Sequence, residues 1–350
     1  MAETSRTGKQ ARILKPTDRA YRLLARTLRD GGVVGVPTET VYGLAAHALD
    51  EGACEKIFLV KGRPTSDPLI VHVRSLQDAE KLAMFSDQAR AVAKAFWPGP
   101  LTIVLPKRPH VPGIVTAGLD SVAVRVPRHP VFRALLKVCG LPLAAPSANL
   151  FGYISPTTAQ HVQAGLGDRI PYILDGGSSR IGVESTILDA RDPNRLRILR
   201  PGVITAEAIS RTVREGGGKP VAKSLNRPRS KKAQPGEAQV APGMLTRHYS
   251  PATPLHLVGR ITSRQVRSAS EQTGWLFYSR PVEIPEGVSR RDVFWLCEKG
   301  KPEQAARRLF GLLRRLDAAG YARIVAESAP PSLLADAIND RLKRAAAKAG

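Results

Sequence analysis

The residues best placed to do chemistry lie in one stretch of the chain, 33–73. A β-branched run at 33–36 ends at Pro37, which predicts a buried strand that feeds a loop. The loop brings together hydroxyl, carboxylate and phenol groups from Thr38, Glu39, Thr40 and Tyr42. Because binding sites concentrate in loops at strand ends, this density of polar groups predicts a ligand.

Two cations follow the next predicted helix, 50–60. Lys61 and Arg63 stand just past its end, and the simplest interpretation is that they complement the helix dipole. Pro64, however, stiffens the backbone where these side chains and then Asp67 project, ahead of another predicted strand. We therefore favour a functional role for Lys61 and Arg63.

Arg125 and Arg200 are placed like Arg63, near a proline at the end of a predicted element. Arg125 follows alternating valines in a half-buried strand, so it is either a solvated edge residue or a clamp for a carboxylate. Three arginines in such positions are hard to explain as solvated surface, and they favour an anionic ligand. His72, in the strand predicted at 69–73, is by itself more often a core residue than a ligand.

Other polar groups follow predicted strands or begin a helix. Ser147 and Asn149 come after a strand predicted at 141–145. Ser155 and Pro156 are predicted to start a helix whose first-turn N–H groups would suit an anion. The glycine-bearing loop 175–186 is a weak phosphate signal, because most such loops are only turns, and its most informative pair is Glu184 and Ser185.

The composition indicates a globular protein with an anionic partner. The 350 residues favour two domains, and 53 basic against 30 acidic residues give a formal charge of +23. No apolar stretch reaches membrane-spanning length and the polar N-terminus does not resemble a signal peptide, so we expect a cytoplasmic protein that does not contact membranes. Cys54, Cys139 and Cys297 are far apart and odd in number, which predicts reduced, structural thiols rather than disulfides or a zinc site.

The order of predicted elements divides the chain. Alternating strands and helices from 33 to 202 predict an α/β sheet. The stretch 214–236 is rich in Lys, Arg, Gly and Pro, which is typical of a flexible basic linker. We therefore predict a basic arm at 1–12, a catalytic domain at 13–212, a linker at 213–252 and a small α/β domain at 253–350. The small domain is expected to have four strands and one main helix, 303–319.

Common catalytic motifs are missing from the sequence. It contains no GxxxxGK[ST], no GxGxxG after a strand and no GxSxG. What remains is a site rich in Lys, Arg, Ser and Thr without an obvious nucleophile. That inventory suits phosphate chemistry catalysed by positioning and charge neutralisation, of which the adenylation of a carboxylate is one example.

Nine motifs in order, with a terminal AINDRL segment at 337–342, closely resemble the threonylcarbamoyl-AMP synthase family in its long form. They are PTETVYGL (37–44), KGRPTSDPLIVHV (61–73), PGPLT (98–102), AVRVPRHP (123–130), APSAN (145–149), ISPT (154–157), GVEST (182–186), LRPG (199–202) and APGMLTRHYSP (241–251). The resemblance implies a twisted, open, mixed sheet of the YrdC-like type, linked to a smaller Rossmann-like α/β domain.

The resemblance also implies a reaction and its partners. L-threonine, bicarbonate and ATP would give threonylcarbamoyl-adenylate and pyrophosphate, with Mg²⁺ on the phosphates and no metal ligand assigned among the protein side chains. The adenylate would feed N6-threonylcarbamoyladenosine synthesis beside the anticodon of tRNA. The macromolecular partner would then be tRNA or the machinery that transfers the threonylcarbamoyl group to it.

Site residues follow from the motif positions. Lys61 and Arg63 are expected to be catalytic. Threonine would be held by Thr40, His72, Arg125, the Ala145 backbone and Ser185, with Arg125 on its carboxylate. ATP would be surrounded by Arg63, Asp67, Ser121, Ser147, Asn149, Ser155 and Arg200, and the linker would fold over the site so that His248 or Tyr249 closes it. Family members often carry a neutral amide at position 67, so Asp67 brings a negative charge near phosphates unless metal or Lys61 compensates.

Two other function classes stay open at this point. A double-stranded RNA-binding module is suggested by the +23 charge and the basic linker, although it leaves Thr40, His72 and Ser185 unexplained. A YrdC-like carbamoyl transferase with another acceptor is the second alternative, but such relatives carry other attached domains and lack the APGMLTRHYSP segment.

Overall fold

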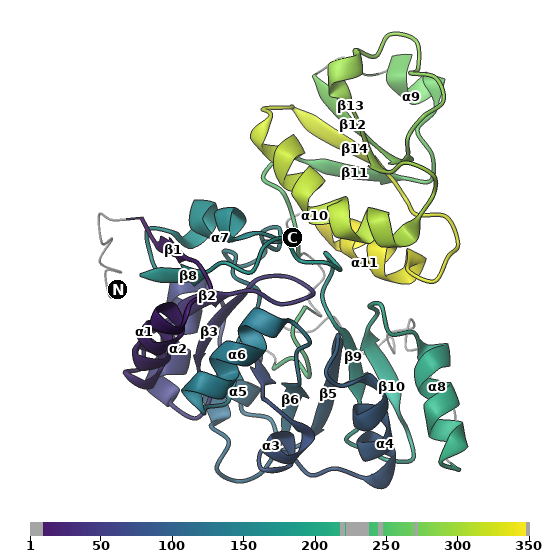
Figure 1. The fold of residues 1–350 in the computed structure, drawn as a ribbon. Helices are drawn as coiled ribbons and strands as arrows, with labels where there is room; N and C mark the ends of the chain where they lie inside the picture. The colour runs from purple at the N-terminus through teal and green to yellow at the C-terminus, as the bar shows by residue number, and fades with distance from the viewer. Residues whose placement is uncertain are drawn as a thin grey trace. The chain divides into compact units, whose positions relative to one another are not determined.

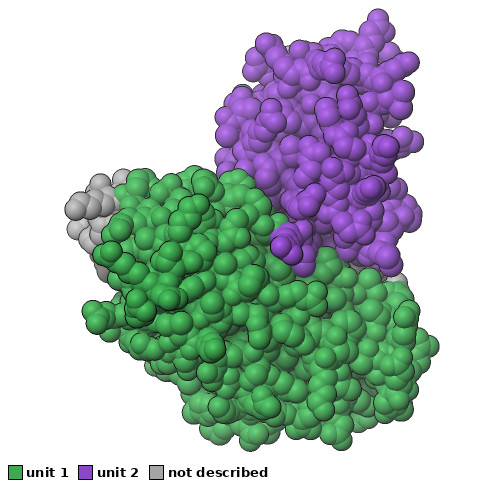
Figure 2. Space-filling model, viewed as in Figure 1, with its two compact units in different colours: residues 1–151, 156–179, 184–244 green, residues 152–155, 180–183, 245–350 purple. Residues whose placement is uncertain are grey.

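The computed structural model describes residues 10–217, 221, 238–243, 248–267, 269 and 272–347. The chain forms two compact units, coloured separately in Figure 2. Unit 1 comprises 1–151, 156–179 and 184–244, and unit 2 comprises 152–155, 180–183 and 245–350. The predicted linker lies largely outside the described residues, as does most of the predicted N-terminal arm. Ala11, at the end of that arm, is buried, and Arg12 already begins a strand.

Unit 1 is built on a mixed sheet, in which the described residues contribute ten strands in the order β1-β8-β2-β3-β7-β4-β6-β5-β9-β10 (Figure 1). Pairs such as β4·β6 and β5·β9 are parallel, whereas β2·β3, β4·β7 and β5·β6 are antiparallel. The strands are β1 (Arg12–Leu14), β2 (Val34–Val36), β3 (Gly43–His47), β4 (Ile70–His72), β5 (Leu101–Pro106), β6 (Ser121–Arg125), β7 (Leu143–Ala144), β8 (Tyr172–Leu174), β9 (Thr186–Asp189) and β10 (Arg197–Arg200). The mixed α/β sheet expected from the sequence is thus confirmed.

Helices flank this sheet, and their ends follow local capping rules. They are α1 (Asp18–Arg29), α2 (Glu51–Lys61), α3 (Leu76–Glu80), α4 (Asp87–Phe96), α5 (Gly113–Thr116), α6 (Pro130–Cys139), α7 (Ala159–Leu166) and α8 (Ala206–Glu215). Helix α2 begins because the side chain of Asp50 accepts a hydrogen bond from Ala53 N–H, and it ends at Gly62, which has a left-handed φ of 62°. Lys61 is therefore the last helical residue and Arg63 begins the loop.

The core of unit 1 lies on both faces of the sheet. On one face, α1 and α6 pack against each other and cover a cluster that includes Leu24, Leu28 and Phe132. The other large cluster joins α2 and α4 to the strands through residues such as Ile57, Val92 and Ile103. Because these side chains are fully buried, the strand ends between the two layers are held in fixed positions.

Unit 2 contains a four-stranded sheet of described residues, and all of its strand pairs are parallel. The strand order is β11 (Leu255–Val258), β14 (Arg323–Glu327), β12 (Thr273–Ser279) and β13 (Val293–Cys297). Its helical segments are α9 (Ser263–Arg267), the 3₁₀ turn η1 (Arg290–Asp292), α10 (Pro302–Ala318) and α11 (Ala335–Ala345). The strands agree with the small α/β domain predicted from the sequence.

Two short pieces that precede the predicted linker in the sequence, 152–155 and 180–183, belong to unit 2. The Tyr153 hydroxyl donates to Asp317 Oδ2 at 2.5 Å, and the Arg314 guanidinium lies 5.0 Å from the centre of the Tyr153 ring. Arg314 also donates to the carbonyl of Ile154. These contacts attach segment 152–155 to α10 within the unit.

Two sequence expectations about helices were wrong or incomplete. The helix predicted to start at Ser155 begins instead at Ala159, and Thr158 is its N-cap, with its side chain accepting from His161 N–H. The N–H groups expected in a first turn at 155–158 are therefore not helical donors. Helices α8 and α11 were not predicted.

The three cysteines are buried free thiols. Among the residues described, no helix is long and apolar enough to cross a membrane.

Candidate active site

Lys61 lies buried at the end of α2, with 2% of its surface exposed. Its Nζ donates to the carbonyls of Ser147 and Asn149, both at 2.5 Å, and thereby joins α2 to the loop after β7. Burial lowers the pKa of Lys61 well below its ordinary value, and the nearby charge of Arg63 lowers it further. A neighbouring anion would offset the cost of keeping Lys61 charged, so the position is suited to a negatively charged ligand.

Arg63 is folded back onto the loop that follows it. Its Nε donates to the carbonyl of Asp67 at 3.0 Å, and its Nη2 donates to the carbonyl of Pro68 at 2.7 Å. Asp67 Oδ2 also forms an ion pair with Nη2 at 3.0 Å. Arg63 is thus held by backbone and side-chain groups of one tight loop.

Asp67 is a buried carboxylate, with 1% of its surface exposed. Its Oδ1 has no hydrogen-bond partner in the part of the chain that the structure describes. Burial raises the pKa of Asp67, and this outweighs the opposing effect of the positive charges of Arg63, Lys61 and Arg200. Asp67 therefore lies within the electrostatic reach of all three cations.

Arg200 connects the end of β10 to the segment before β9. Its Nε donates to the carbonyl of Ser185 at 3.2 Å and its Nη2 to Ser185 Oγ at 3.2 Å. The hydroxyls of Ser185 and Thr102 lie 2.8 Å apart. The third nitrogen, Nη1, donates to the carbonyl of Pro242 at 3.3 Å.

The segment 238–243, part of the predicted linker, lies in unit 1 against these loops. Besides the Pro242 contact, Gln239 N–H donates to the carbonyl of Ser66 at 2.9 Å. Ala241 is fully buried in a cluster with Ile70 and Ala123, on β4 and β6. This segment therefore packs beside the loop of Asp67 and contacts Arg200.

Arg125, at the end of β6, is buried and contacts three different segments. Its Nη2 donates to Glu39 Oε1 at 2.6 Å, its Nη1 to Thr40 Oγ1 at 3.0 Å and its Nε to the carbonyl of Gly99 at 3.2 Å. The strand thus delivers a guanidinium to the polar loop after β2. The alternative of a solvated edge arginine is excluded, because only 3% of Arg125 is exposed.

His72 lies on β4 directly beside Arg125, its partner in the register of β6. Burial, reinforced by the charge of Arg125, lowers the pKa of His72 to about 3. The ring is therefore neutral near pH 7, and its Nδ1 has no hydrogen-bond partner within the described residues. His72 also lies 5.5 Å from the Phe132 ring, so it belongs both to the core and to the site.

The remaining predicted residues of unit 1 lie on the same strands and loops. Ser121 begins β6 and is buried, and Ser147 and Asn149 are joined by their carbonyls to Lys61. The N–H of Ala145 already donates to the carbonyl of Ile70 at 3.0 Å, so a contact of this backbone with a ligand would use its carbonyl. Unit 1 thus unites one group around Arg125 and one around Lys61, Arg63 and Arg200.

Three predicted nucleotide contacts belong to unit 2 instead: Ser155, His248 and Tyr249. Tyr249 is buried, has a φ of 62°, and lies 5.5 Å from the Phe310 ring and 5.7 Å from the Arg341 guanidinium. His248 stacks edge-on against it at 4.1 Å. Both aromatic residues are therefore packed inside unit 2.

The sequence did not assign a role to several residues that the structure connects to the site. Glu39 and Thr38 were noticed only as polar loop residues, yet Thr38 Oγ1 lies 2.7 Å from Thr40 Oγ1. Thr102 and His129 were within motifs but carried no role. Their contacts join segments far apart in the sequence, and only the density of polar groups in 38–42 hinted at them.

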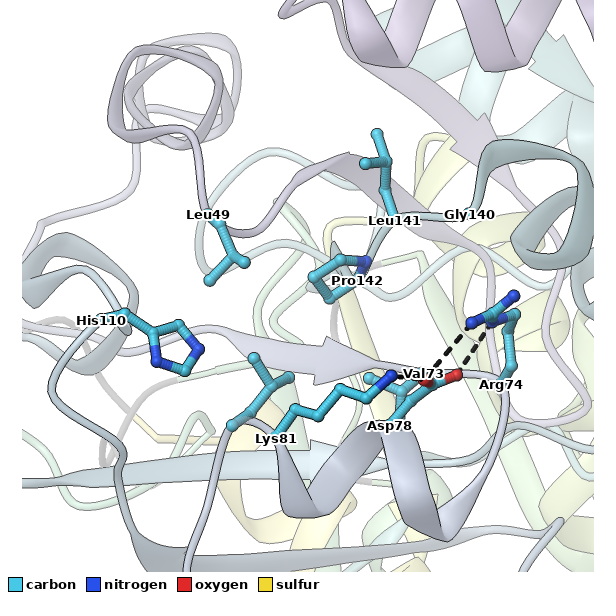
Figure 3. Close-up of a pocket in the computed structure, with 10 residues that line it drawn as sticks. Leu49, Val73, Arg74, Asp78, Lys81, His110, Gly140, Leu141 and Pro142 are labelled. Carbon is cyan, nitrogen blue, oxygen red and sulfur yellow. Dashed lines mark hydrogen bonds and ion pairs between the residues drawn. The ribbon is translucent and has the colours of Figure 1, made fainter.

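Figure 3 shows a pocket of about 210 Å³ that contains none of the predicted site residues. Its charged side chains already satisfy each other, since Arg74 and Lys81 both bind Asp78, at 2.8 and 3.0 Å. The rest of the lining is mostly apolar, with Leu49, Val73, Leu82, Leu141 and Pro142. Nothing in it duplicates the buried cations of the site.

No cluster of three or more His, Cys, Asp or Glu side chains suited to a metal ion occurs in the described ranges. Asp67 is the carboxylate that lies among the cations of the site. The arrangement can therefore bind a carboxylate at Arg125 and a polyanion at the three cations.

Both parts of the chain match known protein families. A family model described as "Telomere recombination" matches residues 26–202, and one described as "Threonylcarbamoyl-AMP synthase, C-terminal domain" matches 204–347. The threonylcarbamoyl-AMP synthase of Pyrococcus abyssi is 39% identical over 93% of each chain. That of Bacillus subtilis is 40% identical over 95% of this chain and 94% of its own.

The chain belongs to the threonylcarbamoyl-AMP synthase family. It has the long form, with both domains, as the sequence motifs predicted. The solved structure of P. abyssi Sua5 complexed with L-threonine superposes with a TM-score of 0.83 at 36% identity, covering 96% of this chain and 98% of that one. The prediction of a transferase enzyme that forms threonylcarbamoyl-AMP is confirmed by this membership.

Proposed function

We propose that unit 1 converts L-threonine, bicarbonate and ATP into threonylcarbamoyl-AMP and pyrophosphate, using the residues described above. The observation that carries the proposal is the pairing of a buried arginine, Arg125, with a cluster of three cations, Lys61, Arg63 and Arg200, in one unit. Arg125 matches the carboxylate of an amino acid, and the three-cation cluster matches a triphosphate. The threonine complex of the P. abyssi relative supports the first assignment.

At the threonine end, we assign Arg125 to the α-carboxylate, with Thr40, His72, Ser185 and the Ala145 carbonyl around the rest of the molecule. A neutral His72 suits this role, because a second buried cation beside Arg125 would be costly. Ser185 offers a hydroxyl that is already oriented by Arg200 and Thr102. We therefore assign Ser185 to the place where threonine and nucleotide meet, because Arg200 belongs to the cation cluster.

At the nucleotide end, we assign Lys61, Arg63 and Arg200 to the phosphates. The attacking threonylcarbamate and the α-phosphate are both anionic, and their repulsion is large where water is excluded. Buried cations that are already oriented reduce this repulsion without reorganising during the reaction. Ser121, Ser147 and Asn149 are assigned to the nucleotide from unit 1, while the nucleotide contacts expected of Ser155, His248 and Tyr249, which belong to unit 2, stay predictions.

Mg²⁺ fits this site as a partner of the ATP phosphates rather than as a resident ion. Mg²⁺ is commonly bound by one or two carboxylates together with substrate phosphates. Asp67 supplies one buried carboxylate whose Oδ1 has no hydrogen-bond partner in the described chain. When bound, the ion would neutralise charge on the phosphates, while Asp67 would hold it on the protein side.

The product is proposed to serve threonylcarbamoylation of tRNA, through tRNA itself or the transfer machinery. The formal charge of +23 supports a polyanionic partner.

The test is pyrophosphate release from ATP in bicarbonate buffer with Mg²⁺, with and without L-threonine. Release that requires both threonine and bicarbonate is expected, with L-serine as the comparison substrate. Release that ignores threonine would overturn the substrate assignment and redirect the work to RNA binding and other carbamoyl acceptors.

A further inference from the structure

Glu39 is a buried, ionised carboxylate beside the proposed threonine site, with 5% of its surface exposed. Its Oε1 accepts from Arg125 Nη2 at 2.6 Å, and its Oε2 accepts from the backbone N–H of His129 at 3.3 Å. Burial raises the pKa of Glu39, but the charge and the hydrogen bond of Arg125, together with backbone hydrogen bonds, outweigh it, so the pKa lies below its ordinary value. Both oxygens are therefore bound to groups on β6 and at the start of α6.

The hydrogen bonds of Arg125 leave a specific set of donors for substrate. A guanidinium has five N–H groups, one on Nε and two on each Nη. Within the described chain, Nε is used by Gly99, one Nη1 donor by Thr40 and one Nη2 donor by Glu39. One N–H on each Nη thus has no acceptor among the described residues and is available to the carboxylate of a substrate.

We propose that Glu39 is a positioning residue for the threonine substrate. It fixes Arg125 at Nη2, so that the two remaining donors point to where the α-carboxylate of the substrate binds. It also keeps the loop of Thr40 against β6, because its neighbour Thr40 contacts Nη1 of the same guanidinium. This inference rests on the proposed function, in which Arg125 binds the threonine carboxylate.

The alternative is that Glu39 competes with the substrate and leaves Arg125 when threonine binds. Glu39 would then stay in a buried place with backbone N–H groups, such as that of His129, as its partners. A buried carboxylate deprived of its cation is strongly unfavourable. Because Arg125 has donors left for a substrate, threonine can bind to it without displacing Glu39.

The experiment compares Glu39→Ala and Glu39→Gln with the unmodified full chain. The Kd of L-threonine is measured by calorimetry, and the KM values of threonine and ATP are measured by pyrophosphate release. For Glu39→Ala we expect the Kd and KM of threonine to rise between about tenfold and a hundredfold, because a misplaced clamp costs that much. The KM of ATP is expected to stay unchanged. Glu39→Gln keeps an oxygen for Nη2 and should recover part of the loss.

A matched control is Asp189→Asn, which changes another buried carboxylate held by two arginines, Arg191 and Arg197, at the end of β9 opposite to Ser185. It should leave the threonine KM unchanged. If circular dichroism shows that Glu39→Ala does not fold, the near-isosteric Glu39→Gln alone tests the proposal. Tighter threonine binding in the Glu39 variants would establish competition and overturn the proposal, as would unchanged binding. If the unmodified chain neither binds nor requires threonine, the proposed function itself fails.

Discussion

Arg63 and Asp67 form an ion pair inside unit 1, with 3.0 Å between Nη2 and Oδ2 and both side chains almost fully buried. The pair places a carboxylate where the proposed function requires a cation to meet phosphate. Asp67 thus acts as an internal anion for Arg63, Lys61 and Arg200, all of which act on its pKa. Removal of Arg63 should therefore weaken the binding of ATP, whereas removal of Asp67 should strengthen the binding of metal-free ATP.

Arg63→Ala should abolish the conversion of ATP to pyrophosphate while the fold is kept. Loss of one oriented donor at a developing charge typically slows turnover by about a hundredfold to a thousandfold. Turnover is measured by pyrophosphate release and folding by circular dichroism. Arg74→Ala, which removes a half-exposed arginine paired with Asp78, is the control and should leave turnover unchanged. Normal turnover in Arg63→Ala would contradict the assignment of this cation.

Asp67→Asn should bind metal-free ATP more tightly than the unmodified chain does. The substitution removes a buried negative charge beside the proposed phosphate site, and we expect about a tenfold lower Kd, which corresponds to about 1.4 kcal/mol of relieved repulsion. The gain should shrink when Mg²⁺ is added, because the variant also loses a ligand for the ion. Calorimetric titrations of ATP with EDTA and with Mg²⁺ measure both effects. Equal affinities of the two proteins under both conditions would argue against Asp67 contacting either phosphate or metal.

His72 should make the stability of unit 1 depend on pH in the acid range. Its folded-state pKa of about 3 lies below the ordinary histidine value of 6.5, so the unfolded chain binds more protons between these limits. The free energy of unfolding is therefore highest above pH 6.5 and falls as the pH drops toward 3, by up to about 1.4 kcal/mol per pH unit.

His72→Gln should flatten this part of the stability curve. Denaturant midpoints at pH 7, 6 and 5 compare the variant with the unmodified chain, and His110→Gln, at an exposed position, serves as the control. Identical pH slopes for His72→Gln and the unmodified chain would show that burial of the histidine ring does not cause the effect.

Gly202→Ala should destabilise the chain, although its backbone is not in the left-handed region. A Cβ at this position would lie 2.4 Å from the backbone nitrogen of Thr186 and 2.7 Å from its Oγ1. Backbone atoms cannot move aside cheaply, so we expect a loss of at least about 2 kcal/mol in the free energy of unfolding. Gly113→Ala is the matched control, because its Cβ would meet no atom within 4 Å. Similar melting temperatures for the two variants would contradict the close approach of Gly202 to the start of β9.

The sequence predicted the elements whose signals are local. Asp50 and Gly62 cap α2 as the helix pattern required, and this alone places Lys61 at the end of the helix and Arg63 in the loop that follows. β3 was not predicted because its sequence, GLAAH, has no β-branched residue and residues 43–46 are all buried, without alternation. The helix expected at Ser155 fails because the Pro156 carbonyl accepts from Tyr42 N–H, and Thr158 becomes the cap instead.

The composition of the candidate site was more predictable than its connections. The residue types at 40, 61, 63, 125 and 200 already indicated anion binding. The bond between Glu39 and Arg125 joins residues 86 positions apart, and no local pattern specifies which carboxylate meets which arginine. Such pairings depend on strand order, which follows from the packing of the whole sheet.

The segments 152–155 and 180–183 give unit 2 a discontinuous origin in the gene. A fragment that starts at residue 245 would lack the Tyr153 hydroxyl that binds Asp317 and the Ile154 carbonyl that binds Arg314. Segment 180–183 also packs closely within the unit, because a Cβ at Gly182 would lie 2.4 Å from the Cα of Arg307. Unit 2 is therefore not a module that recombination or cloning can transplant by a single cut, and fusions that aim to carry it must carry both short segments as well.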